Sequence, residues 1–178
     1  MSALGRLAEL IRDQGGLLAQ MIRPAGAPRS DRPPAEGAAP GPAQIAASGP
    51  RAARRRAEYE VLIEAIYEGY LLHYGTPRVL QERTDPEMRL LAGDRLYALG
   101  LSRLVALGDV AAVSELADLI TISAQAQEAG EVALASAAWD AGAQAVGWGS
   151  SEPHRRAKAL AMARDPGALA AMRACVRR

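Results

Sequence analysis

The sequence has no phenylalanine, a single cysteine and only two histidines among its 178 residues. Because Cys175 has no second cysteine to pair with, an internal disulfide is excluded, which is typical of proteins in a reducing compartment. No apolar run reaches the roughly 20 residues that a membrane-spanning helix needs, and the N-terminus shows no signal-peptide pattern. These absences predict a cytoplasmic protein.

Residue patterns that support chemistry are missing as well. No two aspartates are adjacent, no Walker-type phosphate loop occurs, and His73 and His154 lie far apart without a cysteine at metal-ligand spacing. No nucleophile stands out beside a base. The formal net charge of +1 gives no global field that attracts nucleic acid. The sequence therefore predicts no enzymatic activity, no cofactor, no metal site and no nucleic-acid partner.

Alanine and leucine, which favour helices, are abundant, and no run of β-branched residues alternates with polar ones. The fold class predicted is all-α. Seven prolines lie among alanine and glycine between residues 24 and 50, where there is little apolar surface to bury. We expect residues 24–50 to form a disordered linker between an N-terminal segment, residues 1–23, and a compact helical bundle, residues 51–178.

The N-terminal segment has the pattern of a short amphipathic helix. Its apolar residues recur at helical spacing, and Gly15-Gly16 interrupts the pattern. Such a helix with mixed charges can dock into a partner's groove or pack on its own domain. Contact of residues 3–22 with a membrane surface is the alternative, and it would make the protein peripheral at a membrane.

Cap and turn signals divide residues 51–178 into helices. Gly75-Thr76-Pro77 ends the first long helix, Asp85-Pro86 begins the next, and Gly108-Asp109 separates that helix from a third. Ser151-Glu152-Pro153 repeats the cap-plus-proline pattern and begins a later helix. Farther on, the Gly147-Trp148-Gly149 loop predicts an exposed Trp148, which is a candidate interface anchor. The basic residues between His154 and Lys158 are expected to form a solvated face.

The first long helix begins with three arginines, which oppose the positive end of the helix dipole: Arg54, Arg55 and Arg56. We expect a solvated helix start, and a contact with an anion is the alternative. Three glutamates at four-residue spacing are expected to line the polar face of the same helix: Glu60, Glu64 and Glu68.

The helix expected over residues 88–107 carries one acidic residue, Asp94, on its most apolar face. On a wheel of about 100° per residue, Asp94 lies in the middle of a sector formed by Leu90, Leu91, Tyr97, Ala98, Leu101, Leu104 and Val105. This pattern predicts a central helix of the bundle with a buried apolar face. Tyr97 and Leu101 are candidate interface residues. Gly93 and Gly100, at the margin, allow another backbone to approach closely.

A carboxylate in an apolar face costs several kcal/mol unless it is paired or hydrogen-bonded. Three arrangements would satisfy Asp94. It can cap a neighbouring helix, it can pair with an arginine or with His73, or it can face a polar cavity and contact a ligand.

Residues 59–128 resemble the polyprenyl diphosphate synthase superfamily, and most of all the small non-catalytic subunit of two-component prenyl synthases. The resemblance lies in three stretches: Leu90-Leu91-Ala92-Gly93-Asp94, Tyr97-Ala98-Leu99, and the run from Leu104 to Leu119 across Gly108-Asp109. Catalytic members hold diphosphates through aspartate-rich motifs and Mg²⁺, and those motifs have no counterpart in this sequence. The resemblance implies an accessory subunit in which Asp94 has an architectural role.

These observations together predict a non-catalytic helical subunit that binds a protein partner, which the resemblance identifies as a polyprenyl diphosphate synthase chain. Two alternatives come from other classes of function. One is a membrane-surface adaptor that uses the N-terminal segment. The other is a helical domain that binds an apolar ligand such as an isoprenoid, with Asp94 near the mouth of the cavity.

Overall fold

The computed structural model describes residues 2–24, 40–81 and 85–176, and nearly all of its regular structure is helical. The elements in chain order are α1 (Ala3–Gln14), α2 (Gly16–Gln20), α3 (Pro42–Ser48), the 3₁₀ helix η1 (Pro50–Arg55), α4 (Arg56–Tyr74), α5 (Pro86–Ala106), α6 (Val110–Glu128), α7 (Val132–Trp148), α8 (Glu152–Met162) and α9 (Ala168–Cys175). The all-α prediction is confirmed. None of the helices in these ranges has the length and apolarity needed to cross a bilayer.

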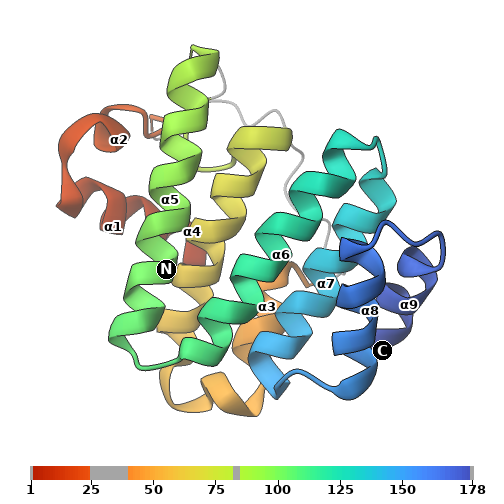
Figure 1. The fold of residues 1–178 in the computed structure, drawn as a ribbon. Helices are drawn as coiled ribbons and strands as arrows, with labels where there is room; N and C mark the ends of the chain where they lie inside the picture. Colours follow the sequence, from red (N-terminus) through yellow and green to blue (C-terminus); the bar gives the residue numbers. More distant parts are fainter. Residues whose placement is uncertain (1, 25–39, 82–84, 177–178) are drawn as a thin grey trace.

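The helices run side by side across the molecule. Figure 1 shows α1 and α2 next to α5 at one edge, α4, α6 and α7 in the middle, and α8 and α9 at the opposite edge. Two of the predicted caps begin helices as expected, because Asp109 accepts a hydrogen bond from the backbone N–H of Ala112 and Ser151 accepts one from His154.

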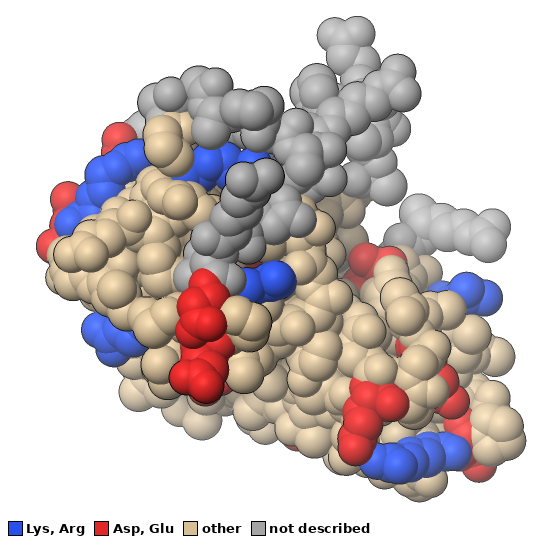
Figure 2. All heavy atoms as spheres, turned by 90° about the horizontal axis from the view of Figure 1, so that it is seen from above, with Lys and Arg blue, Asp and Glu red and all other residues tan. Residues whose placement is uncertain are grey.

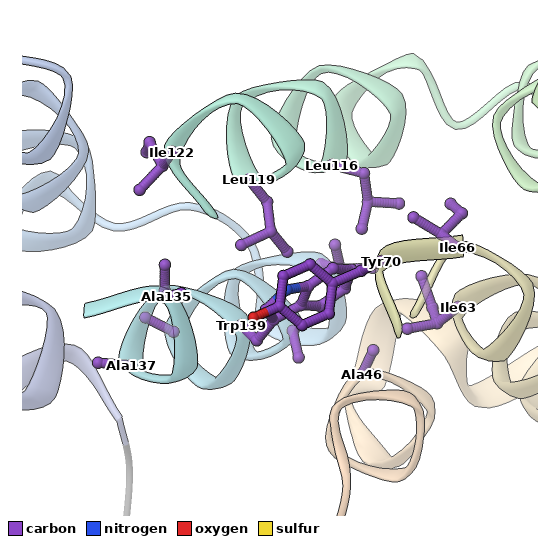
Figure 3. Close-up of a cluster of buried hydrophobic side chains, with 14 of the residues drawn as sticks. Ala46, Ile63, Ile66, Tyr70, Leu116, Leu119, Ile122, Ala135, Ala137 and Trp139 are labelled. Atoms are coloured by element: carbon purple, nitrogen blue, oxygen red, sulfur yellow. The ribbon is translucent and has the colours of Figure 1, made fainter. Parts of the chain in front are cut away.

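The main core lies where α4, α6 and α7 meet. The indole of Trp139 on α7 is 2 % exposed, and its ring centroid lies 4.8 Å from that of Tyr67 and 5.2 Å from that of Tyr70. Leu116 and Leu119 of α6 point toward this aromatic group (Figure 3). Large aromatic rings from α4 and α7 thus fill the space that phenylalanine fills in many other proteins.

Helix α3 corrects the predicted linker. It lies within residues 24–50, yet Ala43, Ala46 and Ala47 are buried against α4 and α7. The helices approach so closely that a Cβ added to Gly147 would lie 2.6 Å from the carbonyl oxygen of Ala46. Alanine and glycine therefore bury this segment by close backbone approach rather than by large side chains. Residues 25–39 of the predicted linker lie outside the described ranges.

The N-terminal segment packs on its own domain, one of the arrangements expected for it. Leu7 and Ile11 of α1 are buried in a second core with residues of α4 and α5, and Arg6 forms a 2.7 Å ion pair with Glu60. The chain after α2 then pairs with residues 79–81. The N–H of Arg23 donates to the carbonyl of Val79, and that of Gln81 donates to Met21. The apolar face of α1 is therefore occupied within the protein.

Candidate functional site

The outer face of α5 is the largest departure from the sequence-based expectation. Leu90, Leu91 and Val105 are 49 %, 61 % and 56 % exposed, and Ala98 is exposed as well. Only Leu104 of the sector predicted to be buried lies in the core. Figure 1 shows α5 at the outside of the bundle, flanked by α1 and α2 and by α4. Leu90, Leu91, Ala98 and Val105 of the apolar sector thus face solvent, and the predicted central position of this helix is corrected to a peripheral one.

The opposite, inner face of α5 explains this orientation. A Cβ added to Gly69 of α4 would lie 2.9 Å from the carbonyl oxygen of Gly93, and one added to Gly100 would lie 3.0 Å from that of Leu62. The two helices therefore contact each other backbone to backbone, as the sequence predicted for Gly93 and Gly100. Ala92, Leu96, Leu99 and Leu104 surround these glycines and are buried. The glycines let the two backbones approach, and the leucines beside them are buried at this contact, which leaves Leu90, Leu91 and Val105 on the outer face.

Asp94 lies in the middle of the exposed face. Its side chain is 69 % exposed, and its Oδ1 lies 3.2 Å from Nε2 of His73 on α4, without hydrogen-bond alignment. Of the arrangements expected for Asp94, the structure shows the contact with His73, whereas the predicted burial is wrong. Because water solvates the carboxylate, it carries little of the desolvation cost expected for a buried acid.

The other predicted interface residues are less accessible. Tyr97 stacks on His73 with ring centroids 5.4 Å apart and is half-buried, and burial raises the pKa of its hydroxyl. Leu101 is half-buried against the main core. These two side chains form one margin of the outer face. Trp148 is also half-buried, which corrects its expected exposure, and it ends α7, a helix that α4 and α6 separate from α5 in Figure 1.

Three arginines at the junction of η1 and α4 are exposed, as predicted, and their side chains make no hydrogen bond or ion pair within the described ranges: Arg54, Arg55 and Arg56. The neighbouring Arg51 instead donates to Asp109 at 2.6 Å, and the hydroxyl of Tyr59 donates to the other oxygen of Asp109 at 2.5 Å. Burial opposes ionisation of Asp109, but these hydrogen bonds and that from Ala112 outweigh it and lower its pKa. Burial and the contact with Asp109 raise the pKa of Tyr59 to about 12.

Glu64 and Glu68 belong to a first buried charged cluster, which the sequence did not predict. The sequence placed both residues on the polar face of the helix. Glu68 is fully buried, and its Oε1 accepts hydrogen bonds from three backbone N–H groups. The N···O distances are 2.7 Å for Arg78, 2.6 Å for Val79 and 3.2 Å for Leu80. The guanidinium of Arg78 forms a 2.5 Å ion pair with Glu64. Glu68 therefore anchors the loop that pairs with residues 21–23. Glu68 follows Glu64 by four residues, which is the spacing typical of a solvated helix face. The sequence therefore contains no signal that Glu68 anchors this loop.

A second buried cluster joins α6 to α8. Glu115, 5 % exposed, contacts Nε2 of His154 and accepts a 2.9 Å hydrogen bond from Lys158, which also donates to Asp118 at 2.6 Å. Burial opposes ionisation of Glu115, yet these two partners lower its pKa. His154 and Lys158 are thus internal ties between helices and not parts of the solvated basic face expected from sequence.

The described ranges contain no group of three or more His, Cys, Asp or Glu side chains close enough to hold a metal ion. Cys175 is half-buried in α9, and burial raises the pKa of its thiol, which lowers the thiolate fraction that would act as a nucleophile. On the face seen from above the bundle, acidic and basic groups are interspersed and separated by wide areas of other residues (Figure 2). The outer face of α5, where Leu90, Leu91, Ala98 and Val105 are exposed, is the candidate functional surface.

Comparison with protein-family models, with curated proteins and with solved structures yields no match.

Proposed function

We propose that this protein is a non-catalytic helical subunit that binds another protein through the outer face of α5. The observation that carries the proposal is the exposure of several large apolar side chains along one face of one helix. Scattered exposed leucines are ordinary, whereas an apolar patch rimmed by polar residues is typical of interaction sites. Leu90, Leu91, Ala98 and Val105 are exposed on this face.

The spacing of the outer face favours a helical partner. Leu91, Asp94, Ala98, Leu101 and Val105 follow one another at steps of three and four residues. This is the heptad spacing of a coiled-coil seam, in which side chains of one helix fill holes on the facing helix. A single polar residue within such a seam fixes the register of pairing at some cost in stability. Asp94 occupies that position in this protein.

Charge complementarity defines the partner more closely. A partner helix with apolar residues at the same spacing and a lysine or arginine opposite Asp94 would pair the carboxylate as the interface excludes water. A second copy in parallel register would instead bring two Asp94 carboxylates together, which is unfavourable. Parallel pairing with a second copy is therefore unfavourable, and we propose a different chain as the partner. The resemblance of residues 59–128 to the small subunit of two-component prenyl synthases makes a polyprenyl diphosphate synthase catalytic chain the first partner to test.

The proposal is tested by purifying the tagged protein from its native host as wild type and as two variants. Val105→Glu places a charge in the seam, and Val132→Glu places the same charge at an equally exposed valine of α7, since the two side chains are 56 % and 59 % exposed. We expect one helical protein to co-purify at near-equal amounts with wild type and Val132→Glu and to be lost with Val105→Glu.

Restoration of binding completes the test. Asp94→Lys should weaken the complex, and replacing the facing cation of the partner by glutamate should restore it, as in a double-mutant cycle. A chain that remains monomeric and co-purifies with no protein contradicts the proposal. Equal loss of a partner with Val105→Glu and Val132→Glu would contradict the assignment of the surface.

A further inference from the structure

A groove of about 320 Å³ lies between α5 and the N-terminal helices α1 and α2. Its walls are mainly apolar, with residues from both sides: Ile11, Leu18, Met21, Leu91, Ala92 and Leu99. The groove lies beside the outer face of α5 and shares Leu91 with it. Its volume is at the lower end of the range of ligand sites, which begins at about 300 Å³.

Two glycines account for the opening of this groove. Gly15 and Gly16 separate α1 from α2 and have φ values of +66° and +70°, in the left-handed region that favours glycine. An added Cβ at either position would meet no atom within 4 Å. The chain therefore turns at these residues without a side chain that fills the space. The double glycine, which interrupts the helical pattern in the sequence, thus shapes one wall of the groove.

One cation lines the groove together with these apolar side chains. Arg95 of α5 is exposed, and its guanidinium donates a 3.4 Å hydrogen bond to Oε1 of Gln14. It makes no ion pair with a carboxylate among the described residues. A guanidinium presents parallel donors that match the two oxygens of a carboxylate. The groove thus combines an apolar channel with one available anion-binding group.

We infer that this groove binds a fatty acid, with the carboxylate on Arg95 and the alkyl chain between Leu18, Met21 and Leu99. One guanidinium matches the single negative charge of a carboxylate, and the small volume fits one medium-length chain rather than two. The site goes beyond the proposed protein-binding function and does not depend on it, because binding is measured on the isolated protein.

The head-group contact is tested by titration calorimetry of the full chain with decanoate and with decanol, both below the concentration at which they aggregate. Wild type should bind decanoate more tightly than decanol. Arg95→Gln should weaken decanoate binding about fivefold, the upper range for an exposed ion pair, and leave decanol binding unchanged. Arg103→Gln, at another exposed arginine of α5 that does not line the groove, is the matched control and should change neither affinity.

Charge reversal gives a second, opposite readout. Arg95→Glu should bind decyltrimethylammonium more tightly than wild type does and should lose its preference for decanoate.

The location of the alkyl chain is tested by the methyl NMR signals of two buried methionines. Decanoate should shift the signal of Met21, which lines the groove, and leave that of Met172 in the main core unchanged.

Three results would overturn the inference. The first is an absence of decanoate binding to wild type. The second is equal affinity of wild type for decanoate and decanol. The third is an equal response to Arg95→Gln and Arg103→Gln. None of these results bears on whether Val105→Glu releases a protein partner, so the two proposals fail independently.

Discussion

The inner and outer faces of α5 both carry large apolar side chains, but only those of the inner face are buried. The inner face presents Gly93 and Gly100 to α4, together with the buried Leu96 and Leu99. The outer face also carries large aliphatic side chains, yet Leu90, Leu91 and Val105 are 49 %, 61 % and 56 % exposed. On α5, the close approach of two backbones therefore marks the buried face, and the apolar residues that remain outside are available to a partner.

The largest contrast between the two faces should appear when one leucine on each is truncated. Leu96→Ala on the inner face removes a fully buried side chain and should lower the free energy of unfolding by about 3 kcal/mol, through lost transfer energy and the remaining cavity. Leu91→Ala, where the leucine is 61 % exposed, should change it by less than about 0.5 kcal/mol. Urea denaturation measures both, and similar losses would reverse the assignment of the faces.

Adding a methyl group sharpens the comparison. Gly100→Ala should destabilise the protein by about 2 kcal/mol, because the new Cβ would lie 3.0 Å from the carbonyl oxygen of Leu62 and closer still to Ile66. The gain in helix propensity, about 1 kcal/mol, only partly offsets this overpacking. Ser102→Ala on the exposed side of the same helix is the control, and it should leave the melting temperature nearly unchanged. A more stable Gly100→Ala protein would disprove the close approach of α4 and α5.

The turn after α5 makes a smaller, pH-dependent contribution. Since the pKa of Asp109 is lowered from its ordinary value of 3.8, its stabilisation is present above that value and is lost as the pH falls through the lower folded-state pKa. Asp109→Ala should lower the free energy of unfolding by about 1–2 kcal/mol at neutral pH. The variant should also lose less stability than wild type as the pH falls through the range in which Asp109 titrates. Asp85→Ala should cost less, because Asp85 precedes α5 without a side-chain capping bond. Identical acid limbs in wild type and Asp109→Ala would contradict the anchoring role.

Asp94 should have the smallest effect on the isolated protein. With its side chain 69 % exposed, Asp94→Ala should change the free energy of unfolding by no more than about 0.5 kcal/mol. A loss of several kcal/mol would restore the architectural, buried role that the sequence predicted. A negligible change in stability together with weakened partner binding would match a residue that acts in the interface.

The sequence predicted the helical class, the caps at Asp109 and Ser151, and the close approach at Gly93 and Gly100. Each of these depends on local chemistry or on the absence of a side chain. The orientation of α5 was not predictable from its wheel, because a wheel ranks faces by apolar content and contains no information on the shape of α4.

The same limit applies to two other features. Helix α3 was assigned to a linker because its alanines and glycines offer little apolar area, although they pack tightly on α7. Glu68 was assigned to a polar face, although it receives backbone N–H groups from residues 78–80 that only the tertiary fold brings to it. Both depend on partners that are distant in the chain.

Docking of a partner on the outer face of α5 is tested most directly by thiol labelling of Ala98→Cys in a Cys175→Ser background, with Val132→Cys as the exposed control. We expect rapid modification of residue 98 in the isolated protein and strong protection of it in the complex purified from the host, with residue 132 labelled rapidly in both. Slow labelling of residue 98 in the isolated protein, or equal labelling with and without the partner, would contradict the claim that the outer face of α5 is the docking surface.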